Sequence, residues 1–182
     1  DWGAWNGYLS AAMYYDTEYE YFCIRNACGT YDISPMQKYL VTGVDAEAML
    51  NRLVTRDIRK MKDDRVSYVV WCDDEGRIVD DGTVFRLSQE RYMLTCGSPC
   101  PAWLRMAAFG FDDLEVEDVS DHLAALALQG PTSCAVLKRM GLDGIENAKR
   151  FDIRHFPFHG GELMVSRTED RQPGTRPVTA GA

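Results

Sequence analysis

Residues 65–87 read RVSYVVWCDDEGRIVDDGTVFRL, and this stretch determines the class of fold that we expect. Both of its ends are rich in β-branched and aromatic residues, which favour strands. Between them lies the polar segment Asp73–Gly76, whose final glycine can adopt the positive φ of a tight turn. The stretch therefore predicts a β-hairpin with strands at Arg65–Cys72 and Arg77–Leu87, and Arg91–Thr95 is expected to add a third antiparallel strand.

Helices and further strands are expected on both sides of this hairpin. Asp45 precedes Ala46, Met49, Leu50 and Leu53, which follow the i, i+3, i+4, i+7 pattern of one buried helix face and predict a capped helix. The predicted helices span about 18–26, 46–53, 101–109 and 131–140, and the remaining predicted strands span 38–44, 114–119, 123–129 and 163–166. This mixture is typical of an α+β fold, with helices covering one face of a mostly antiparallel sheet.

Two terminal segments differ from the rest of the chain. Residues 1–30 are rich in tyrosine and tryptophan, and such a segment is expected to pack over a core or to line a cavity. Residues 169–182 read EDRQPGTRPVTAGA and contain one apolar side chain larger than alanine, which predicts an irregular tail. We therefore expect an ordered region over residues 1–168.

The composition is that of a globular protein. The chain has 182 residues, 46% of them hydrophobic, and a formal net charge of −8. This acidic balance argues against sequence-independent binding to nucleic acid or to an anionic membrane, both of which need a basic surface. No apolar run approaches the roughly 20 residues of a membrane helix, so we expect a cytoplasmic protein. In a chain this long the six cysteines are expected to be free thiols rather than a disulfide framework.

The adjacent carboxylates of Asp80 and Asp81 are the strongest candidates for a site. Because side chains alternate between the two faces of a strand, one aspartate is expected to point inward and the other outward. An inward carboxylate beside Val79, Val84 and Phe85 would need compensation, which is found at functional sites more often than elsewhere. The alternative is a solvated pair flanking the hairpin turn.

Other constellations are weaker. Cys96 and Cys100 together with His155 and His159 have the ligand count of a zinc site, but their spacing is loose and packing is the better interpretation. No local signature supports a nucleophilic cysteine paired with histidine. Neither GxxxxGK nor GxGxxG occurs, so these motifs do not predict a phosphate loop.

Four segments in the same order resemble the aminomethyltransferase family, which includes the glycine cleavage T-protein and folate-dependent demethylases. They are IRNACGTYDISPM at residues 24–36, RVSYVVW at 65–71, GRIVDD at 76–81 and LALQGP at 126–131. The resemblance covers about residues 18–168. It implies a ferredoxin-like unit that, with neighbouring domains, surrounds a cavity for tetrahydrofolate.

The resemblance also implies site residues. Asp80 matches the family's folate-contacting aspartate, with electrostatic stabilisation of the reacting nitrogen as its catalytic role. Tyr68 matches an aromatic position beside the pterin, Met36 matches the methionine of the DxSxM segment, and Cys96 stands where the family has asparagine. The implied cofactor is tetrahydrofolate, and the implied partner is a small one-carbon donor or a lipoyl-carrier protein.

Several departures distinguish this chain from glycine cleavage T-proteins. Pro35 replaces a histidine, and Glu169–Arg171 stands where the family continues with a GYTGE-like segment. The aromatic start is more similar to that of the demethylases. We therefore expect either a folate-dependent one-carbon transferase, present here as a fragment, or a non-catalytic folate-binding module related to iron–sulfur assembly factors. The oligomeric state is left open.

Overall fold

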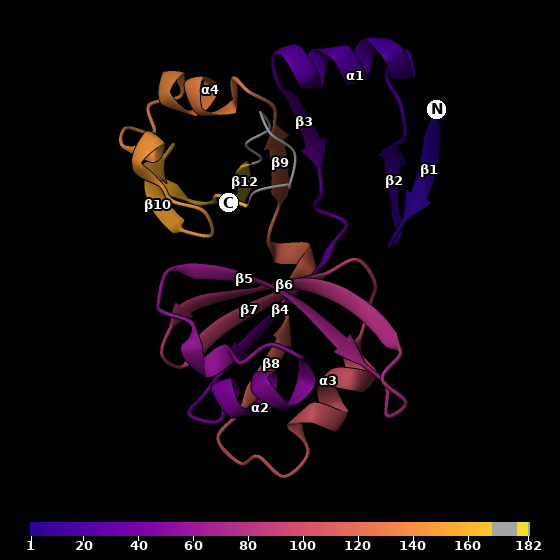
Figure 1. Ribbon diagram of the computed structural model, residues 1–182, viewed down its shortest axis with the longest axis vertical. Coiled ribbons are helices and arrows are strands. Elements are labelled where there is room, and N and C mark those ends of the chain that lie inside the picture. Colours follow the sequence, from indigo (N-terminus) through magenta and orange to yellow (C-terminus); the bar gives the residue numbers. More distant parts are fainter. Residues whose placement is uncertain (169–177, 182) are drawn as a thin grey trace. The chain divides into compact units, whose positions relative to one another are not determined.

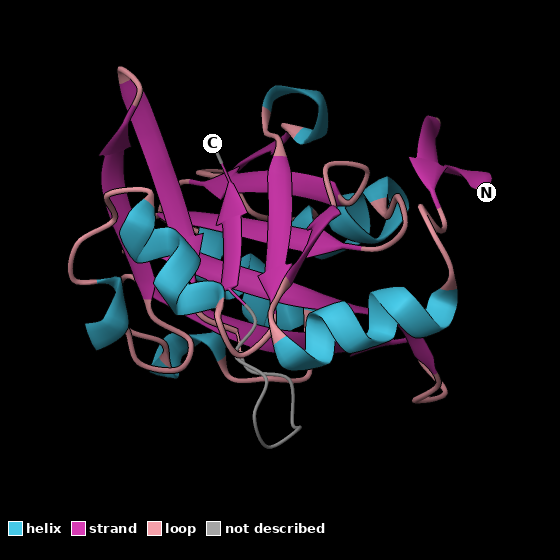
Figure 2. Cartoon of the chain, turned by 90° about the horizontal axis from the view of Figure 1, so that it is seen from above, coloured by secondary structure: helices cyan, strands magenta, loops and turns pink. Residues whose placement is uncertain are grey.

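The computed structural model describes residues 1–168 and 178–181, which form two compact units. Unit 2 is the continuous segment Met36–His122, and unit 1 combines Asp1–Pro35 with Leu123–Ala182. Figure 1 labels most of their helices and strands, and Figure 2 distinguishes helices from strands. None of the described helices is long and apolar enough to cross a membrane.

Unit 2 is an antiparallel sheet with both of its α-helices on one side (Figure 1). Its elements in chain order are β4 (Gln37–Thr42), α2 (Ala46–Leu53), the short 3-10 helix η1 (Ile58–Lys60), β5 (Arg65–Cys72), β6 (Ile78–Ser88), β7 (Arg91–Cys96), α3 (Pro101–Ala108), β8 (Glu115–Asp118) and the 3-10 helix η2 (Ser120–His122). The strand order is β5-β6-β7-β4-β8. Without β5 this is the β-α-β-β-α-β arrangement of a ferredoxin-like unit, which confirms the predicted fold class.

The core of unit 2 lies between this sheet and its two helices. Met49 and Leu50 of α2 and Leu104 of α3 pack against the alternate residues of the strands that face them, among them Val41 and Leu94. The predicted apolar spacing of α2 therefore marks its buried face. One detail of that prediction is wrong: the Asp45 side chain makes no capping bond to α2, because its carboxylate accepts the backbone N–H of Asp113 instead (3.1 Å).

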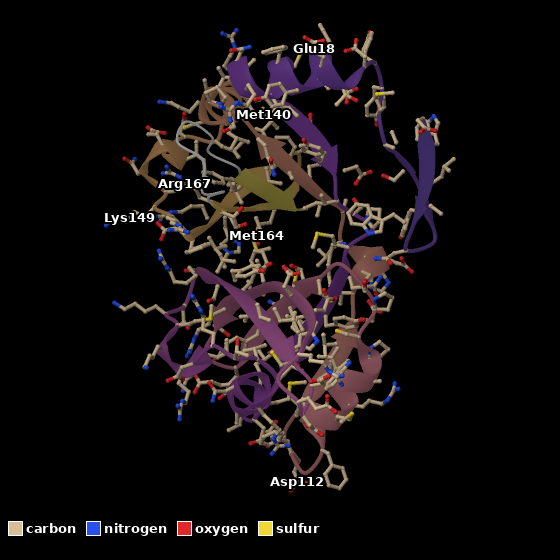
Figure 3. The ribbon with its side chains drawn as sticks, turned by 45° about the vertical axis from the view of Figure 1, so that its right-hand side comes forward. Glu18, Asp112, Met140, Lys149, Met164 and Arg167 are labelled. Carbon is tan, nitrogen blue, oxygen red and sulfur yellow. The ribbon has the colours of Figure 1, made fainter. Side chains whose placement is uncertain are left out.

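Unit 1 holds a second antiparallel sheet that is built from both parts of the chain. Its elements are the paired strands β1 (Trp2–Trp5) and β2 (Tyr8–Ala11), then α1 (Thr17–Asn26), β3 (Gly29–Asp32), β9 (Ala125–Gln129), α4 (Ser133–Arg139), the 3-10 helix η3 (Ile145–Asn147), β10 (Ile153–Phe158), β11 (Gly161–Ser166) and β12 (Val178–Gly181). The five-stranded sheet has the order β10-β11-β12-β9-β3. Figure 3 labels Met164 on β11 and Arg167 directly after it.

The predicted irregular tail needs one correction. Residues 169–177 and 182 lie outside the described residues, but Val178–Gly181 form β12 between β11 and β9. This strand is held by backbone hydrogen bonds to its two neighbours. Because such bonds do not depend on the side chains, the composition of the tail did not predict the strand.

The aromatic start also differs from expectation. No residue of α1 is buried, and Trp2, Tyr14, Tyr15 and Tyr19 are each more than half exposed. Among the described residues these rings lie on the surface instead of covering a core.

Candidate functional site

The register of the β5–β6 hairpin decides which side chains share a face. Tyr68 pairs with Thr83 and Val70 pairs with Asp81, so these four residues lie on one face of the sheet. Asp80 pairs with Trp71, a fully buried residue of the opposite face, which α2 and α3 cover. We call the face that carries Asp81 the outer face and the other the helix face.

A β-bulge sets this arrangement. Cys72 pairs with Ile78 and Trp71 pairs with Asp80, so Val79 is the extra residue of β6. If the pairing continued from Cys72 and Ile78 without the bulge, Val70 would oppose Asp80, and Asp80 would share the face of Tyr68. The bulge therefore exchanges the positions of the two aspartates and brings Asp81 to the outer face.

Tyr68 and Asp81 form an exposed pair on the outer face. The Tyr68 side chain is 49% exposed, and Asp81 is exposed as well. A hydrogen bond to the Asp81 carboxylate raises the pKa of Tyr68 above its ordinary value. The pair thus presents an aromatic ring, a hydroxyl that stays protonated and an acceptor carboxylate at one place.

Polar groups continue from this pair across the outer face. The register aligns Tyr68 of β5 with Thr83 of β6, Thr95 of β7 and Lys38 of β4 in one row. The two threonine hydroxyl oxygens are 2.6 Å apart, and the Lys38 ammonium donates to the carbonyl of Met36 (2.9 Å). We call Lys38, Thr95, Thr83 and Tyr68 the polar row.

The helix face holds the other two predicted site residues. The Asp80 carboxylate accepts the backbone N–H of Asp81 (2.8 Å). The contact with Cys100 and burial raise the pKa of the Cys96 thiol, and the charge of Asp80 adds a smaller effect in the same direction. Cys96 is fully buried and donates to the Ser98 carbonyl (3.2 Å).

The four predicted residues therefore do not converge on one site. The carbonyl of Met36 contacts Lys38 at one end of the polar row and Tyr68 lies at the other end, whereas Asp80 and Cys96 lie on the helix face. Sequence reasoning ranked Asp81 below Asp80 and did not select Thr83, Thr95 or Lys38. Thr83 is the cross-strand partner of Tyr68, and alternation along β6 places Asp81 on the same face. This pairing can be deduced from the hairpin turn only if the position of the bulge is known.

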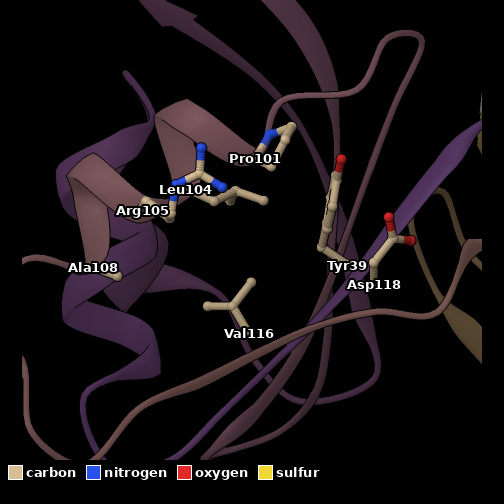
Figure 4. A pocket seen from close by; sticks show the side chains of 7 residues that line it. All are labelled: Tyr39, Pro101, Leu104, Arg105, Ala108, Val116 and Asp118. Atoms are coloured by element: carbon tan, nitrogen blue, oxygen red, sulfur yellow. The ribbon is translucent and has the colours of Figure 1, made fainter.

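A cavity of about 210 Å³ opens on the helix side of unit 2. Figure 4 shows Tyr39 and Asp118 on one side of it, and Leu104, Arg105 and Ala108 of α3 on the other. Burial raises the pKa of Tyr39 to about 12, so its hydroxyl is neutral at physiological pH. None of the four predicted site residues lines this cavity.

The described residues contain no group of three or more histidine, cysteine, aspartate or glutamate side chains arranged to hold a metal ion. His155, one of the four zinc candidates, instead contacts the Glu162 carboxylate (2.9 Å).

Comparison with known proteins gives consistent matches. A family model described as the GCVT N-terminal domain matches residues 2–169. An aminomethyltransferase of Prosthecochloris aestuarii is 30% identical over 167 residues, covering 89% of this chain and 46% of that protein. One from Caldanaerobacter subterraneus is 33% identical over 154 residues, covering 82% and 41%. The chain thus spans about half the length of the curated relatives it matches.

Two solved structures share the fold. The glycine cleavage system aminomethyltransferase T of Bartonella henselae superposes with a TM-score of 0.83 at 27% identity, over all of this chain and 49% of that one. The heterotetrameric sarcosine oxidase of a Corynebacterium superposes with a TM-score of 0.58 over 84% of this chain, and at 15% identity this match concerns the fold alone.

Proposed function

The chain belongs to the GCVT N-terminal domain family, and on this basis we propose that it takes part in folate-dependent one-carbon transfer by binding tetrahydrofolate on the outer face of unit 2. The observation that carries the proposal is the exposed Tyr68–Asp81 pair, which lies within a chain that superposes over its whole length on an aminomethyltransferase. The resemblance to aminomethyltransferases found in the sequence is confirmed by the family model and by the curated relatives.

The residues of the outer face fit a reduced pteridine. Such a ring system is flat and carries several N–H donors, which a carboxylate accepts as charge-assisted hydrogen bonds. Asp81 supplies that acceptor, and the Tyr68 ring supplies an apolar surface beside it. The hydroxyls of Thr83 and Thr95 add donors and acceptors along the same row.

The proposed roles follow from these positions. Tetrahydrofolate, when bound, supplies the nitrogen that takes up the one-carbon group. Asp81 accepts a ligand N–H and stabilises positive charge that develops near it, while the Tyr68 hydroxyl donates to Asp81 and orients the carboxylate. Asp80 acts as a positioning residue, because its side chain holds the backbone N–H of Asp81 from the helix face. Cys96 is too deeply buried to contact a ligand on the outer face.

The donor of the one-carbon group is proposed from family membership alone. The curated relatives are aminomethyltransferases, and we infer that the donor is an aminomethyl group on a lipoyl-carrier protein. A methyl-donating small molecule, as in folate-dependent demethylases, is the second candidate, and the aromatic surface of residues 1–30 is the feature that favours it.

Calorimetric titration with tetrahydrofolate under anoxic conditions tests the proposal. The chain is expected to bind, and Asp81→Asn is expected to weaken binding about tenfold or more, since a hydrogen bond to a charged group contributes about 1.5–3 kcal/mol. Asp80→Asn is the matched control, because an asparagine oxygen can still accept the Asp81 N–H. Equal losses in the two variants, or no heat with the unmodified chain, would reject the site.

Transfer is measured separately from binding. The chain is incubated with tetrahydrofolate and either the aminomethylated carrier protein or a methylated small molecule, and one-carbon adducts of the folate are detected by mass spectrometry. An adduct with the carrier protein is the expected result. Binding without any adduct would favour the non-catalytic folate-binding module.

A further inference from the structure

Two cysteines of unit 2 lie in contact where β7 passes into α3. Cys96 is the last residue of β7, Cys100 is the N-cap of α3, and only Gly97, Ser98 and Pro99 separate them. Their sulfur atoms are 3.7 Å apart, and the side chains are 0% and 5% exposed. The folate site proposed above uses neither thiol.

The two thiols are chemically unequal. The Cys96 S–H group donates to the Ser98 carbonyl (3.2 Å) and contacts the Cys100 sulfur. The sulfur–sulfur contact with Cys96 lowers the pKa of Cys100, while the same contact and burial raise the pKa of Cys96. Asp80 raises the pKa of both thiols, and the contact between the sulfur atoms makes Cys100 the more readily ionised of the two.

The cavity of unit 2 is lined by neighbours of this pair, although by neither cysteine. Pro101, the residue after Cys100, lines the cavity of about 210 Å³, and so does Tyr39. The Tyr39 hydroxyl accepts the backbone N–H of Cys100 (3.1 Å). With 5% of its surface exposed, Cys100 suits a small oxidant such as hydrogen peroxide better than a bulky disulfide.

We propose that Cys96 and Cys100 are a redox modification site that hydrogen peroxide converts to an intramolecular disulfide and that thiols restore. The Cys100 thiolate attacks one peroxide oxygen, the O–O bond breaks, and hydroxide leaves, which gives a sulfenic acid on Cys100. The Cys96 sulfur then attacks the Cys100 sulfur, and the sulfenic oxygen leaves as water with the proton of Cys96. The hydroxide takes up the proton that Cys100 released on ionising, so two thiols are oxidised by one peroxide, which is reduced to two water molecules.

The geometry suits closure of this bond. The sulfur atoms must approach from 3.7 Å to about 2.05 Å. Of the three residues between the cysteines, Gly97 has open space where a Cβ atom would lie, and Ser98 and Pro99 are exposed, so the segment can adjust locally. Closure does not require β7 or α3 to unfold.

Alkylation and peptide mapping test the proposal on the full chain. Cleavage after Arg91 and Arg105 gives the peptide 92–105, which contains both cysteines and no other. After brief exposure to peroxide and alkylation under denaturing conditions, this peptide is expected to lack both alkyl groups and to be lighter than the reduced peptide by two hydrogen atoms. Dithiothreitol is expected to restore double alkylation.

Two comparisons make the result decisive. Loss of alkylation in peptide 92–105 should be faster than at the half-buried Cys72 of the same unit, because a second sulfur lies 3.7 Å from that of Cys100 and captures its sulfenic acid as a disulfide. In Cys100→Ser, Cys96 should be oxidised no faster than Cys72, and it should therefore still be alkylated after brief exposure to peroxide. A peptide that stays doubly alkylated, or rapid oxidation of Cys96 in Cys100→Ser, overturns the proposal, and neither outcome bears on folate binding.

Discussion

The carboxylate of Asp81 is the group on which folate binding is proposed to depend. It lies beside Tyr68 on the outer face, whereas the carboxylate of Asp80 is turned toward the helix face. Two adjacent residues of the same type therefore have different surroundings, and their asparagine variants form a matched pair for experiments. The difference arises from the alternation of side chains along a strand.

Replacing Asp81 by asparagine is expected to lower the pKa of Tyr68 toward about 10, its ordinary value, because the hydrogen bond to the carboxylate raises it. In the unmodified chain the pKa of Tyr68 is raised, so its hydroxyl loses its proton at a higher pH than an ordinary tyrosine does. In Asp81→Asn the loss should occur at a lower pH. A pH titration of ¹³C-labelled tyrosine by NMR measures the midpoint. Asp80→Asn should leave the Tyr68 midpoint unchanged, and a midpoint that does not move in Asp81→Asn contradicts the pairing.

At the scale of the elements, the β5–β6 hairpin was predicted from the sequence except for its bulge. The alternating residues of 65–87 predicted both strands and the turn, because β-branched residues and a turn glycine act locally. The bulge at Val79 has no such local signal: the residue is apolar, like its neighbour Ile78, and only the paired strands reveal which residue is extra. This one residue determines which face each of Asp80 and Asp81 occupies, so the sequence predicted the segment that carries both aspartates but not the face on which each lies.

Deletion of Val79 is expected to leave the fold and the Tyr68–Asp81 pair intact. Removing the extra residue of a bulge restores a regular ladder, so Cys72 still pairs with Ile78 and Trp71 still pairs with Asp80. Deletion of Thr83 is the control, since it turns every later side chain of β6 to the wrong face. Thermal unfolding followed by circular dichroism should show a cooperative transition for the first deletion and its loss for the second. The reverse order would contradict the assigned bulge.

Gly82→Ala is expected to destabilise the sheet by about 2 kcal/mol or more, the cost of forcing extra volume into a packed site. A Cβ atom at this position would lie 2.1 Å from the backbone oxygen of Thr95, so β6 and β7 would have to separate. Gly97→Ala is the control, because no atom lies within 4 Å of its added Cβ. Urea unfolding measures both changes, and equal stability of the two variants would contradict the close approach of the strands.

At the scale of the whole molecule, the two units differ in how far the sequence predicted them. Unit 2 is continuous, and each of its strands and α-helices was predicted because each carries its own local pattern, although the pairing of β4 with β7 and β8 joins distant residues. Unit 1 joins β3 to β9 across nearly a hundred residues, and β12 lies between β9 and β11. Such pairings come from hydrogen bonds between distant backbones, which local patterns do not encode.

The segment 36–122 is expected to fold when it is produced alone. It contains the whole of one core, from Tyr39 and Val41 of β4 to Leu104 and Ala107 of α3, together with the complete sheet that covers it. A single cooperative unfolding transition and dispersed amide NMR signals are the expected results. A fragment that lacks cooperative unfolding would contradict the assignment of unit 2 as a self-sufficient unit.

The most direct test of the proposed site is amide chemical-shift mapping of the ¹⁵N-labelled full chain during titration with tetrahydrofolate. The largest shifts are predicted at Tyr68, Asp81, Thr83 and Thr95, which share the outer face, and in Asp81→Asn they should require about tenfold more folate or greater. Shifts confined to Cys100 and α3 on the helix side, or no shifts at saturating folate, would contradict folate binding on the outer face.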